Sequence, residues 1–250
     1  MRKVSVKGPS AAVSVRPRSS GPIAVAVALL VALAGCAPPV TGPVSTVDSG
    51  LTAPSLAPWE PAHPIVLPPM SDAEAMQLRA EGLANEAKTH GVVDPPVVAL
   101  IRWTSLTDNG VVVAACLREA GFDALGAANG IWFPGAGVGP AQMSAYELAR
   151  YVCDAEYTIH PKYLQPLTDA QWGLQYDYWV EWLVPCLEGL GAHPSEPPTR
   201  DTFVAQAVQG KISWDPYSSV QGTPEYASSI EKTVLLNQTC PVYSMAVWGE

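Results

Sequence analysis

The stretch that decides the fold is TDAQWGLQYDYWVEWLVPCLEGLG, residues 168–191. Thr168 and Gln171 have the spacing of a capping box, so a helix is expected to begin here. Its large side chains recur every three or four residues and share one helix face: Trp172, Tyr176, Trp179, Leu183 and Cys186. Pro185 is expected to bend or end this helix near the cysteine, because proline has no amide hydrogen for an interior helical position.

Similar signals on either side of this stretch predict more helices. Residues that favour helix N-caps precede helical patterns at five further places: Ser71, Asp108, Ser144, Thr199 and Thr223. The last of them is followed by Pro224, which fits the first turn of a helix, and that helix is expected to continue to residue 239. The sequence therefore favours a mainly α fold.

Three short stretches are expected to be extended. Phe122–Leu125 and Ile131–Phe133 flank Gly126–Gly130, whose Asn-Gly pair favours a tight turn and hence a β-hairpin. Val97–Ile101 is a short apolar run after two prolines, which indicates a buried strand or extended segment. The complete expectation is a disulfide-stapled, mainly helical domain with a small β-hairpin.

The N-terminus has the layout of a secretory signal. The first 20 residues contain five basic and no acidic side chains, and Ile23–Ala34 is an unbroken apolar run. As a helix this run would rise about 18 Å, well short of the ~30 Å hydrocarbon core of a bilayer. A permanent membrane span is therefore the weaker interpretation.

The apolar run ends in Leu33-Ala34-Gly35-Cys36, which resembles the lipobox of bacterial lipoproteins. The resemblance implies that residues 1–35 are removed and that Cys36 carries acyl chains such as palmitate. An ordinary secretory signal or uncleaved anchor with an incidental cysteine is the alternative. Two acyl chains hold a protein durably on a membrane without a span. The body is therefore expected on the outer face of the plasma membrane, anchored by lipid.

The charge balance disfavours nucleic acid as a partner. The chain has 14 Lys and Arg against 23 Asp and Glu, a net charge of −9. Removal of residues 1–35 takes away five basic side chains and no acidic ones, which leaves 9 against 23 and a net charge of −14. Such a body repels phosphate-rich partners. The expected partners are the membrane, through the lipid anchor, and a cell-wall component or envelope protein.

Residues 36–70 are expected to form a spacer. Nine prolines and only two formal charges lie between Ala37 and Met70. This composition favours an extended, semi-rigid chain. A proline-rich ligand for another domain is the alternative, but flanking basic residues are missing. The chain is thus divided into a signal peptide (1–35), a proline-rich tether (36–70) and a single helical domain (71–250).

The remaining cysteines lie in or beside predicted helices: Cys116, Cys153, Cys186 and Cys240. An even number of cysteines outside the cytoplasm favours disulfides, whereas C-x-x-C pairs that would favour a zinc or redox site are missing; buried free thiols are the alternative. Four cysteines allow three connectivities. We favour Cys116–Cys153 with Cys186–Cys240, because each bridge then joins a helix to one of the next few elements.

Two cysteine-containing segments resemble each other. Residues 116–121 and 186–191 both have the pattern C-L-x-x-x-G at the end of a predicted helix. Together with Trp-Asp-Pro-Tyr at 214–217, they make residues 98–242 similar to uncharacterised secreted lipoproteins of high-GC Gram-positive bacteria. This resemblance implies secretion and no particular activity.

No catalytic, metal or cofactor site is expected from the motifs. Ser229 and Lys232 have the S-x-x-K spacing of penicillin-binding proteins, but the S-x-N and K-T-G motifs do not follow. Gly135–Gly139 is one residue short of a dinucleotide-binding fingerprint. The four histidines form neither H-E-x-x-H nor a His pair at helical spacing, which disfavours a zinc hydrolase.

Aromatic side chains supply the candidate ligand surface. Trp172, Tyr176 and Trp179 share a helix face, and Trp132 lies beside the glycine-rich stretch. Such rings stack on sugars and peptides, but in a chain with only three Phe the stripe is also needed for the core, which is the favoured interpretation. We expect a non-catalytic binding or structural module of the cell envelope. The alternative is a small envelope hydrolase whose carboxylates converge in a cleft.

Overall fold

The structure is a computed structural model that describes residues 55–128, 130–227 and 229–250. The expected signal peptide, Cys36 and the first part of the tether lie outside the described residues. Within them the chain is mainly helical, with a two-stranded hairpin and two disulfides, which confirms the predicted fold class. No helix of this part combines the length and the apolar character needed to cross a bilayer.

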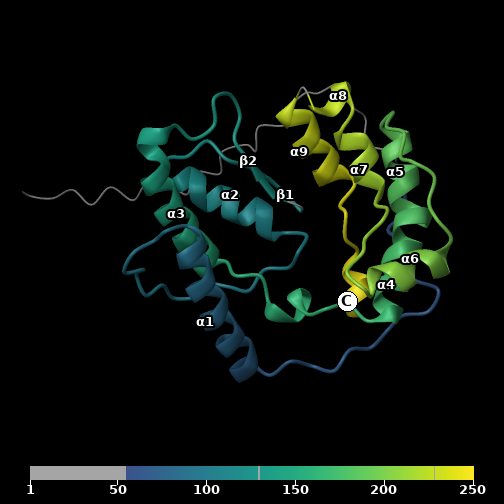
Figure 1. Ribbon diagram of the computed structural model, residues 1–250, viewed down its shortest axis with the longest axis horizontal. Coiled ribbons are helices and arrows are strands. Elements are labelled where there is room, and N and C mark those ends of the chain that lie inside the picture. The colour runs from purple at the N-terminus through teal and green to yellow at the C-terminus, as the bar shows by residue number, and fades with distance from the viewer. Residues whose placement is uncertain (1–54, 129, 228) are drawn as a thin grey trace, which may run out of the picture. The chain divides into compact units, whose positions relative to one another are not determined.

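Figure 1 shows the elements in two groups. The first contains α1 (Asp72–Thr89), α2 (Asn109–Glu119), α3 (Met143–Glu156), β1 (Leu125–Ala127) and β2 (Gly130–Trp132). The second contains α4 (Asp169–Tyr178), α5 (Val184–Gly189), α6 (Arg200–Ala207), α7 (Pro216–Gln221), α8 (Pro224–Ala227) and α9 (Ile230–Thr239). The groups meet where α9 contacts β1, and there the Gln238 side-chain amide donates a hydrogen bond to the Gly126 carbonyl (2.8 Å).

Several predicted N-caps are formed. The Thr168 hydroxyl accepts the amide hydrogen of Gln171, and the Gln171 side chain accepts the amide hydrogen of Thr168, so the capping box of α4 is confirmed. Ser71 caps α1 and Thr199 caps α6 in the same way, each through an amide three residues further on. Asp108 precedes α2 as expected, but its carboxylate accepts from Ser105 instead of from the helix.

Two helix starts differ from the sequence expectation. Ser144 lies inside α3, because Pro140 begins a 3-10 turn that continues directly into that helix. The helix expected from Thr223 to residue 239 is divided into α8 and α9, and α9 has its own N-cap, Ser229. The Ser229 hydroxyl accepts the amide hydrogen of Lys232 at 3.2 Å, so the S-x-x-K pair serves as a cap.

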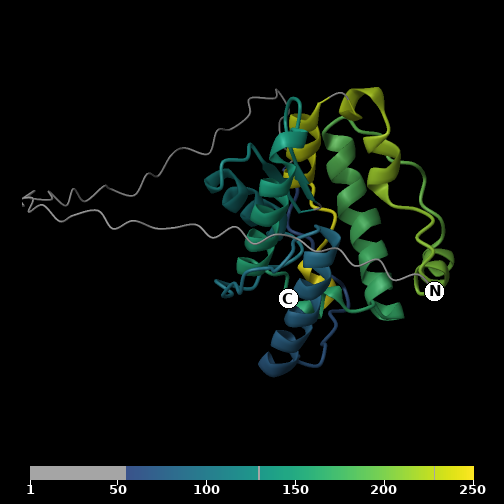
Figure 2. The same cartoon turned by 60° about the vertical axis from the view of Figure 1, so that its left-hand side comes forward.

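α4 and α5 form one continuous rod, the long green helix in Figure 2, joined by the π-helical turn Trp179–Leu183. Pro185 does not end this helix, which continues to Gly189. In the π turn the Val184 amide donates to the Trp179 carbonyl, five residues back instead of four. The wider turn accommodates the proline ring, which in a regular helix collides with the carbonyl four residues before it.

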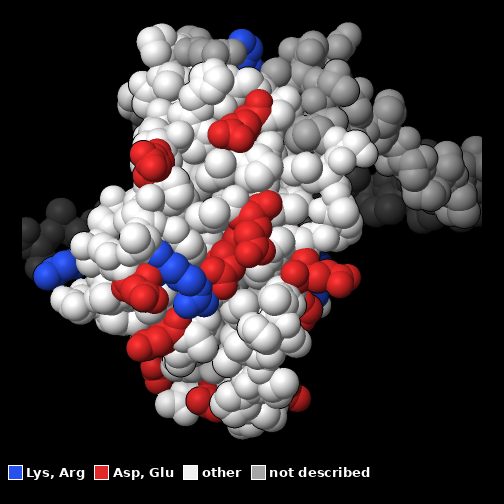
Figure 3. Space-filling model, turned by 90° about the vertical axis from the view of Figure 1, so that its right-hand side faces the viewer, with Lys and Arg blue, Asp and Glu red and all other residues white. Residues whose placement is uncertain are grey.

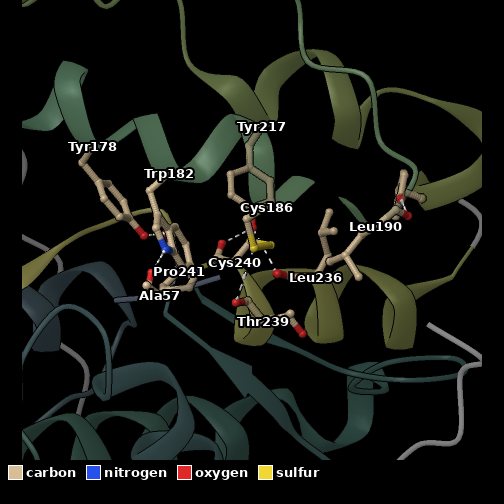
Figure 4. Close-up of a disulfide and its surroundings, with 11 residues drawn as sticks. Ala57, Tyr178, Trp182, Cys186, Leu190, Tyr217, Leu236, Thr239, Cys240 and Pro241 are labelled. Atoms are coloured by element: carbon tan, nitrogen blue, oxygen red, sulfur yellow. Dashed lines mark hydrogen bonds between the residues drawn. A yellow bond between two sulfur atoms is a disulfide. The ribbon is translucent and has the colours of Figure 1, made fainter. Parts of the chain in front are cut away.

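The disulfide Cys186–Cys240 closes the core of the second group by joining α5 to the end of α9 (Figure 4). Buried tyrosines reinforce this junction. The Tyr217 hydroxyl donates to the Cys240 carbonyl, and the Tyr178 hydroxyl donates to the Pro241 carbonyl (2.6 Å). The chain that follows α9 is thus fixed to the rod by covalent and hydrogen bonds.

The second disulfide, Cys116–Cys153, joins α2 to α3 in the core of the first group. Cys153 is 1% exposed, and its neighbours there are the buried aliphatic residues of α2. Both pairings favoured from the sequence are therefore confirmed.

α2 and the hairpin approach each other very closely. β1 and β2 pair antiparallel, with Leu125 opposite Trp132. The predicted hairpin exists, but its strands extend into the stretch expected to be the turn, Gly126–Gly130. A Cβ atom at Gly126 would lie 2.0 Å from the carbonyl oxygen of Gly110 on α2, so no side chain fits. Both glycines therefore serve the close packing of the helix on the hairpin.

The packed part of the chain begins before residue 71, where the helical domain was expected to start. The Trp182 indole donates to the Ala57 carbonyl (2.8 Å), and the Trp59 indole donates to Glu181 (2.8 Å). Trp59, Ile65 and Leu67 also pack on buried residues of the body. The second half of the expected tether therefore belongs to the fold, because its apolar side chains find partners there.

Val97–Ile101 is extended but is neither buried nor part of a sheet. The Val97 side chain is fully exposed and Ile101 is 59% exposed. Amide hydrogens of residues 101 and 102 are bonded to the Glu156 carbonyl at the end of α3. Of the two alternatives, a buried strand or an extended segment, the buried strand is wrong, since this segment is held through its backbone and not through its side chains.

Candidate functional site

The aromatic stripe proposed as a possible ligand surface forms part of the core. Rings of Trp172, Tyr176 and Trp179 surround Phe203, with centroid separations of 6.0, 5.4 and 5.5 Å. Phe203 is fully buried, and Trp179 is 4% exposed. The polar atoms of two of these rings are also bonded within the protein, to the carbonyls of residues 198 and 242. The favoured interpretation of the stripe as core therefore agrees with the structure.

Trp132 lies apart from that stripe, at the end of β2. It is half-buried, and its ring covers Gly130, where an added Cβ would lie 3.4 Å from the indole. The structure therefore does not bring the four aromatic candidates together into one surface.

A pocket in the described part of the chain lies between α1, α3 and residues 158–165. Its volume is about 310 Å³. Aliphatic side chains form part of its wall, among them Leu78, Leu83, Ile159 and Leu164. Four ionisable side chains complete it: Arg79, Glu86, Arg150 and Asp154.

Arg79 is the most buried of these charged residues, at 8% exposure. Its guanidinium donates to the carbonyls of Ala155 (2.6 Å) and Val98 (3.1 Å) and to the hydroxyl of Thr158 (3.2 Å). Burial lowers the pKa of Arg79 below its usual value. This residue connects α1 to the C-terminus of α3, where helix carbonyls lack intrahelical partners.

Arg150 and Asp154 form an ion pair one turn apart on α3. Burial raises the pKa of the Asp154 carboxyl, and the nearby Arg150 guanidinium offsets this only in part. Burial opposes the charge of Arg150 most strongly, but the Asp154 carboxylate and the Tyr146 side chain together outweigh it and raise the pKa of Arg150. The pair therefore keeps two opposite charges fixed at the pocket wall.

His90, at the end of α1, lies between two carboxylates. Its Nε2 atom is 3.1 Å from Glu86, and its Nδ1 atom is in hydrogen-bond contact with Glu147 of α3. The possible ligand atoms of Glu86, His90 and Asp154 all lie within 4.8 Å of one another. These three residues are the set in the described part of the chain that could hold a metal ion.

This cluster was not predicted from the sequence. Pairs of histidines are the usual sequence signal of such a site, whereas the histidine here has carboxylate partners. Glu86-x-x-x-His90 places both side chains on one face of a helix, and Glu147 and Asp154 are two turns apart on another. The first spacing is visible in the sequence, but the packing of α1 against α3 is not.

A second hollow, of about 210 Å³, lies beside Trp59. Its charged residues are already paired. Arg200 donates two hydrogen bonds to Asp177 (2.8 and 3.0 Å), and Glu181 accepts from Trp59. We therefore regard the pocket between α1 and α3 as the candidate site.

Comparison of the chain with protein-family models, with curated proteins and with solved structures finds no match.

Proposed function

We propose that this protein is a lipoprotein of the outer face of the plasma membrane, anchored through Cys36, and that its body is a non-catalytic binding module. Disulfides persist outside the cytoplasm, and the body contains two. Four of the five cysteines pair with one another, so Cys36 is the cysteine that these bridges leave over. This agrees with the lipobox-like sequence Leu33–Cys36.

The pocket between α1 and α3 is the observation that carries the binding role. Aliphatic walls with a few fixed polar groups are typical of sites for small molecules. Here the charged groups are held in place by protein partners, as in the Arg150–Asp154 pair. The pocket is therefore suited to a small ligand that has an apolar part and a polar or charged part.

The acidic surface favours an envelope component, and disfavours nucleic acid, as the binding partner. Figure 3 shows one face of the molecule, on which red carboxylate side chains are more prominent than blue basic ones. With a net charge of −14 after removal of residues 1–35, the body repels polyanions. The proposed partners are the membrane, through the lipid, and a cell-wall or envelope component.

Metabolic labelling with a fatty acid tests the anchor. The wild-type protein is expected to take up the label and to partition with membranes, and Cys36→Ala is expected to lose both properties. A Cys36→Ala protein that still incorporates the label contradicts lipidation at this position.

Thermal unfolding with fractionated envelope extracts tests the binding role. A ligand of the folded state raises the melting temperature by mass action. Gly82 lines the pocket and a Cβ added there meets no atom within 4 Å, so Gly82→Phe can fill the pocket without a backbone clash. A fraction that stabilises the wild type but not Gly82→Phe supports the pocket, and equal stabilisation of both contradicts it.

A carboxylate-based hydrolase is the second candidate function. Glu86 and Asp154 lie within 4.8 Å of each other at the pocket, and burial raises the pKa of Asp154. A carboxyl group with a raised pKa beside a second carboxylate is the arrangement found in glycoside hydrolases. We prefer binding, because the ion pair with Arg150 favours the charged form of Asp154, whereas a general acid must carry a proton. Release of reducing ends from wall glycans by the wild type but not by Glu86→Gln would establish the hydrolase instead.

A further inference from the structure

Three side chains from two helices converge beside the pocket. Glu86 and His90 are one turn apart near the end of α1, and Asp154 is on α3. One potential ligand atom from each lies within 4.8 Å of the others. A tetrahedral zinc site with bonds of about 2.1 Å has ligand atoms about 3.4 Å apart. Binding of an ion would therefore require these side chains to rotate toward one another.

The contacts of His90 favour a ligand role for one of its nitrogens. A metal-bound histidine usually donates its other ring N–H to a carboxylate or carbonyl. His90 has this arrangement, because Nδ1 contacts the Glu147 carboxylate while Nε2 points toward Glu86. A neutral ring with its proton on Nδ1 would direct a lone pair at the Glu86 oxygen 3.1 Å away. A divalent cation bound to both atoms would take up this lone pair and the Glu86 carboxylate together.

The charges around His90 favour a cation there. Three carboxylates lie around the His90 ring. Glu86 and Glu147 contact it, and an oxygen of Asp154 lies within 4.8 Å. Arg150 neutralises one of them. The other nearby guanidinium, that of Arg79, is directed at backbone carbonyls and a hydroxyl. Within the described residues the Glu147 side chain has no basic partner other than His90, and it is only 26% exposed, so solvent screens its negative charge poorly.

We propose that Glu86, His90 and Asp154 bind a divalent transition-metal ion, with Glu147 as the positioning residue that orients His90. One imidazole nitrogen and two carboxylate oxygens suit Zn²⁺, whereas Ca²⁺ and Mg²⁺ take oxygen ligands. The adjoining pocket leaves room for a fourth ligand. The inference goes beyond the proposed binding function and does not depend on acylation of Cys36.

Calorimetric titration of the full chain with Zn²⁺ tests this site. We expect saturation at one ion per chain, with both disulfides formed. His90→Gln and Asp154→Asn are expected to weaken the affinity at least about tenfold, because loss of even an outer-shell partner weakens metal binding about 10–100-fold. His193→Gln is the matched control, since that histidine is exposed and lies outside the cluster. Its affinity for Zn²⁺ is expected to equal that of the wild type.

Glu86→Gln keeps the proposal testable if the other variants misfold. The Glu86 side chain is 46% exposed, so its replacement leaves the core intact. Zn²⁺ is expected to raise the melting temperature of the wild type and of His193→Gln, but not that of Glu86→Gln. Co²⁺ should give visible absorption bands only where the site is intact. Unchanged affinity in the cluster variants, no saturation at one Zn²⁺ per chain, or equally tight Ca²⁺ binding overturns the proposal.

Discussion

The close packing of α2 on the hairpin depends on the absence of a side chain at Gly126. A Cβ at this position would lie 2.0 Å from the Gly110 carbonyl oxygen and 2.8 Å from the Ala114 side chain. We expect Gly126→Ala to lower the free energy of unfolding by about 1–3 kcal/mol, as overpacked cores do. Gly82→Ala is the control, because it meets no atom within 4 Å and replaces glycine in a helix, which should stabilise by about 0.5–1 kcal/mol. Urea titration of both variants checks this, and equal stability would contradict the close contact.

Two buried phenols make the protein sensitive to alkaline pH. Burial raises the pKa of Tyr178, and burial with two neighbouring tyrosines raises the pKa of Tyr217. The folded-state pKa then exceeds the unfolded value of about 10, so the stabilisation is complete below about pH 10 and is lost as pH rises further. We expect the free energy of unfolding to fall above about pH 10, and to fall less steeply in Tyr178→Phe and Tyr217→Phe. The same slope in all three proteins, measured by urea titration, would contradict this.

Part of the candidate site could have been predicted from single residues of the sequence. Glu86 and His90 could have been singled out from their helical spacing alone. The involvement of Asp154 could not, because it is 64 residues further along the chain and reaches the cluster through the packing of α3 on α1. Conversely, Trp172, Tyr176 and Trp179 were correctly expected to favour the core, because a chain with three Phe has few other large apolar rings.

At the scale of elements, the two disulfides join helices that are distant in the sequence. They span separations of 37 and 54 residues, for which the chain-entropy model gives about 4 kcal/mol each. We expect the double variants Cys116→Ala with Cys153→Ala, and Cys186→Ala with Cys240→Ala, to lose similar amounts of stability. Denaturant titrations measure the losses, and a loss below about 1 kcal/mol for either pair would contradict the model.

Helices were predictable where a local signal determines them, and less so where neighbouring elements intervene. The Thr168 capping box is local and is formed as predicted. Ser144 has a similar signal, but Pro140 starts the helical turn earlier. Pro185 was expected to bend or end its helix. Instead of a helix end, the structure has a π turn, and Trp179 in that turn packs into the core. Tertiary packing determined that outcome.

At the scale of the whole molecule, the described half of the proline-rich segment, residues 55–70, is part of the folded body. Trp59 packs on Tyr178 with ring centroids 5.4 Å apart and donates a hydrogen bond to Glu181. We expect Trp59→Ser to lower the free energy of unfolding by about 2 kcal/mol. Val66→Ser, at a side chain that is 95% exposed on the same segment, should have no effect. If both substitutions proved neutral in thermal melts, the segment would not stabilise the body.

The attachment at Ala57 sets a limit on how far the body of a Cys36-anchored protein can stand from the bilayer. Twenty residues separate Cys36 from Ala57, and a fully extended chain of that length reaches about 70 Å. A free tether to Met70 would have reached about 120 Å. If the protein is anchored through Cys36 as we propose, a partner that binds near the attachment point must therefore come within about 70 Å of the membrane.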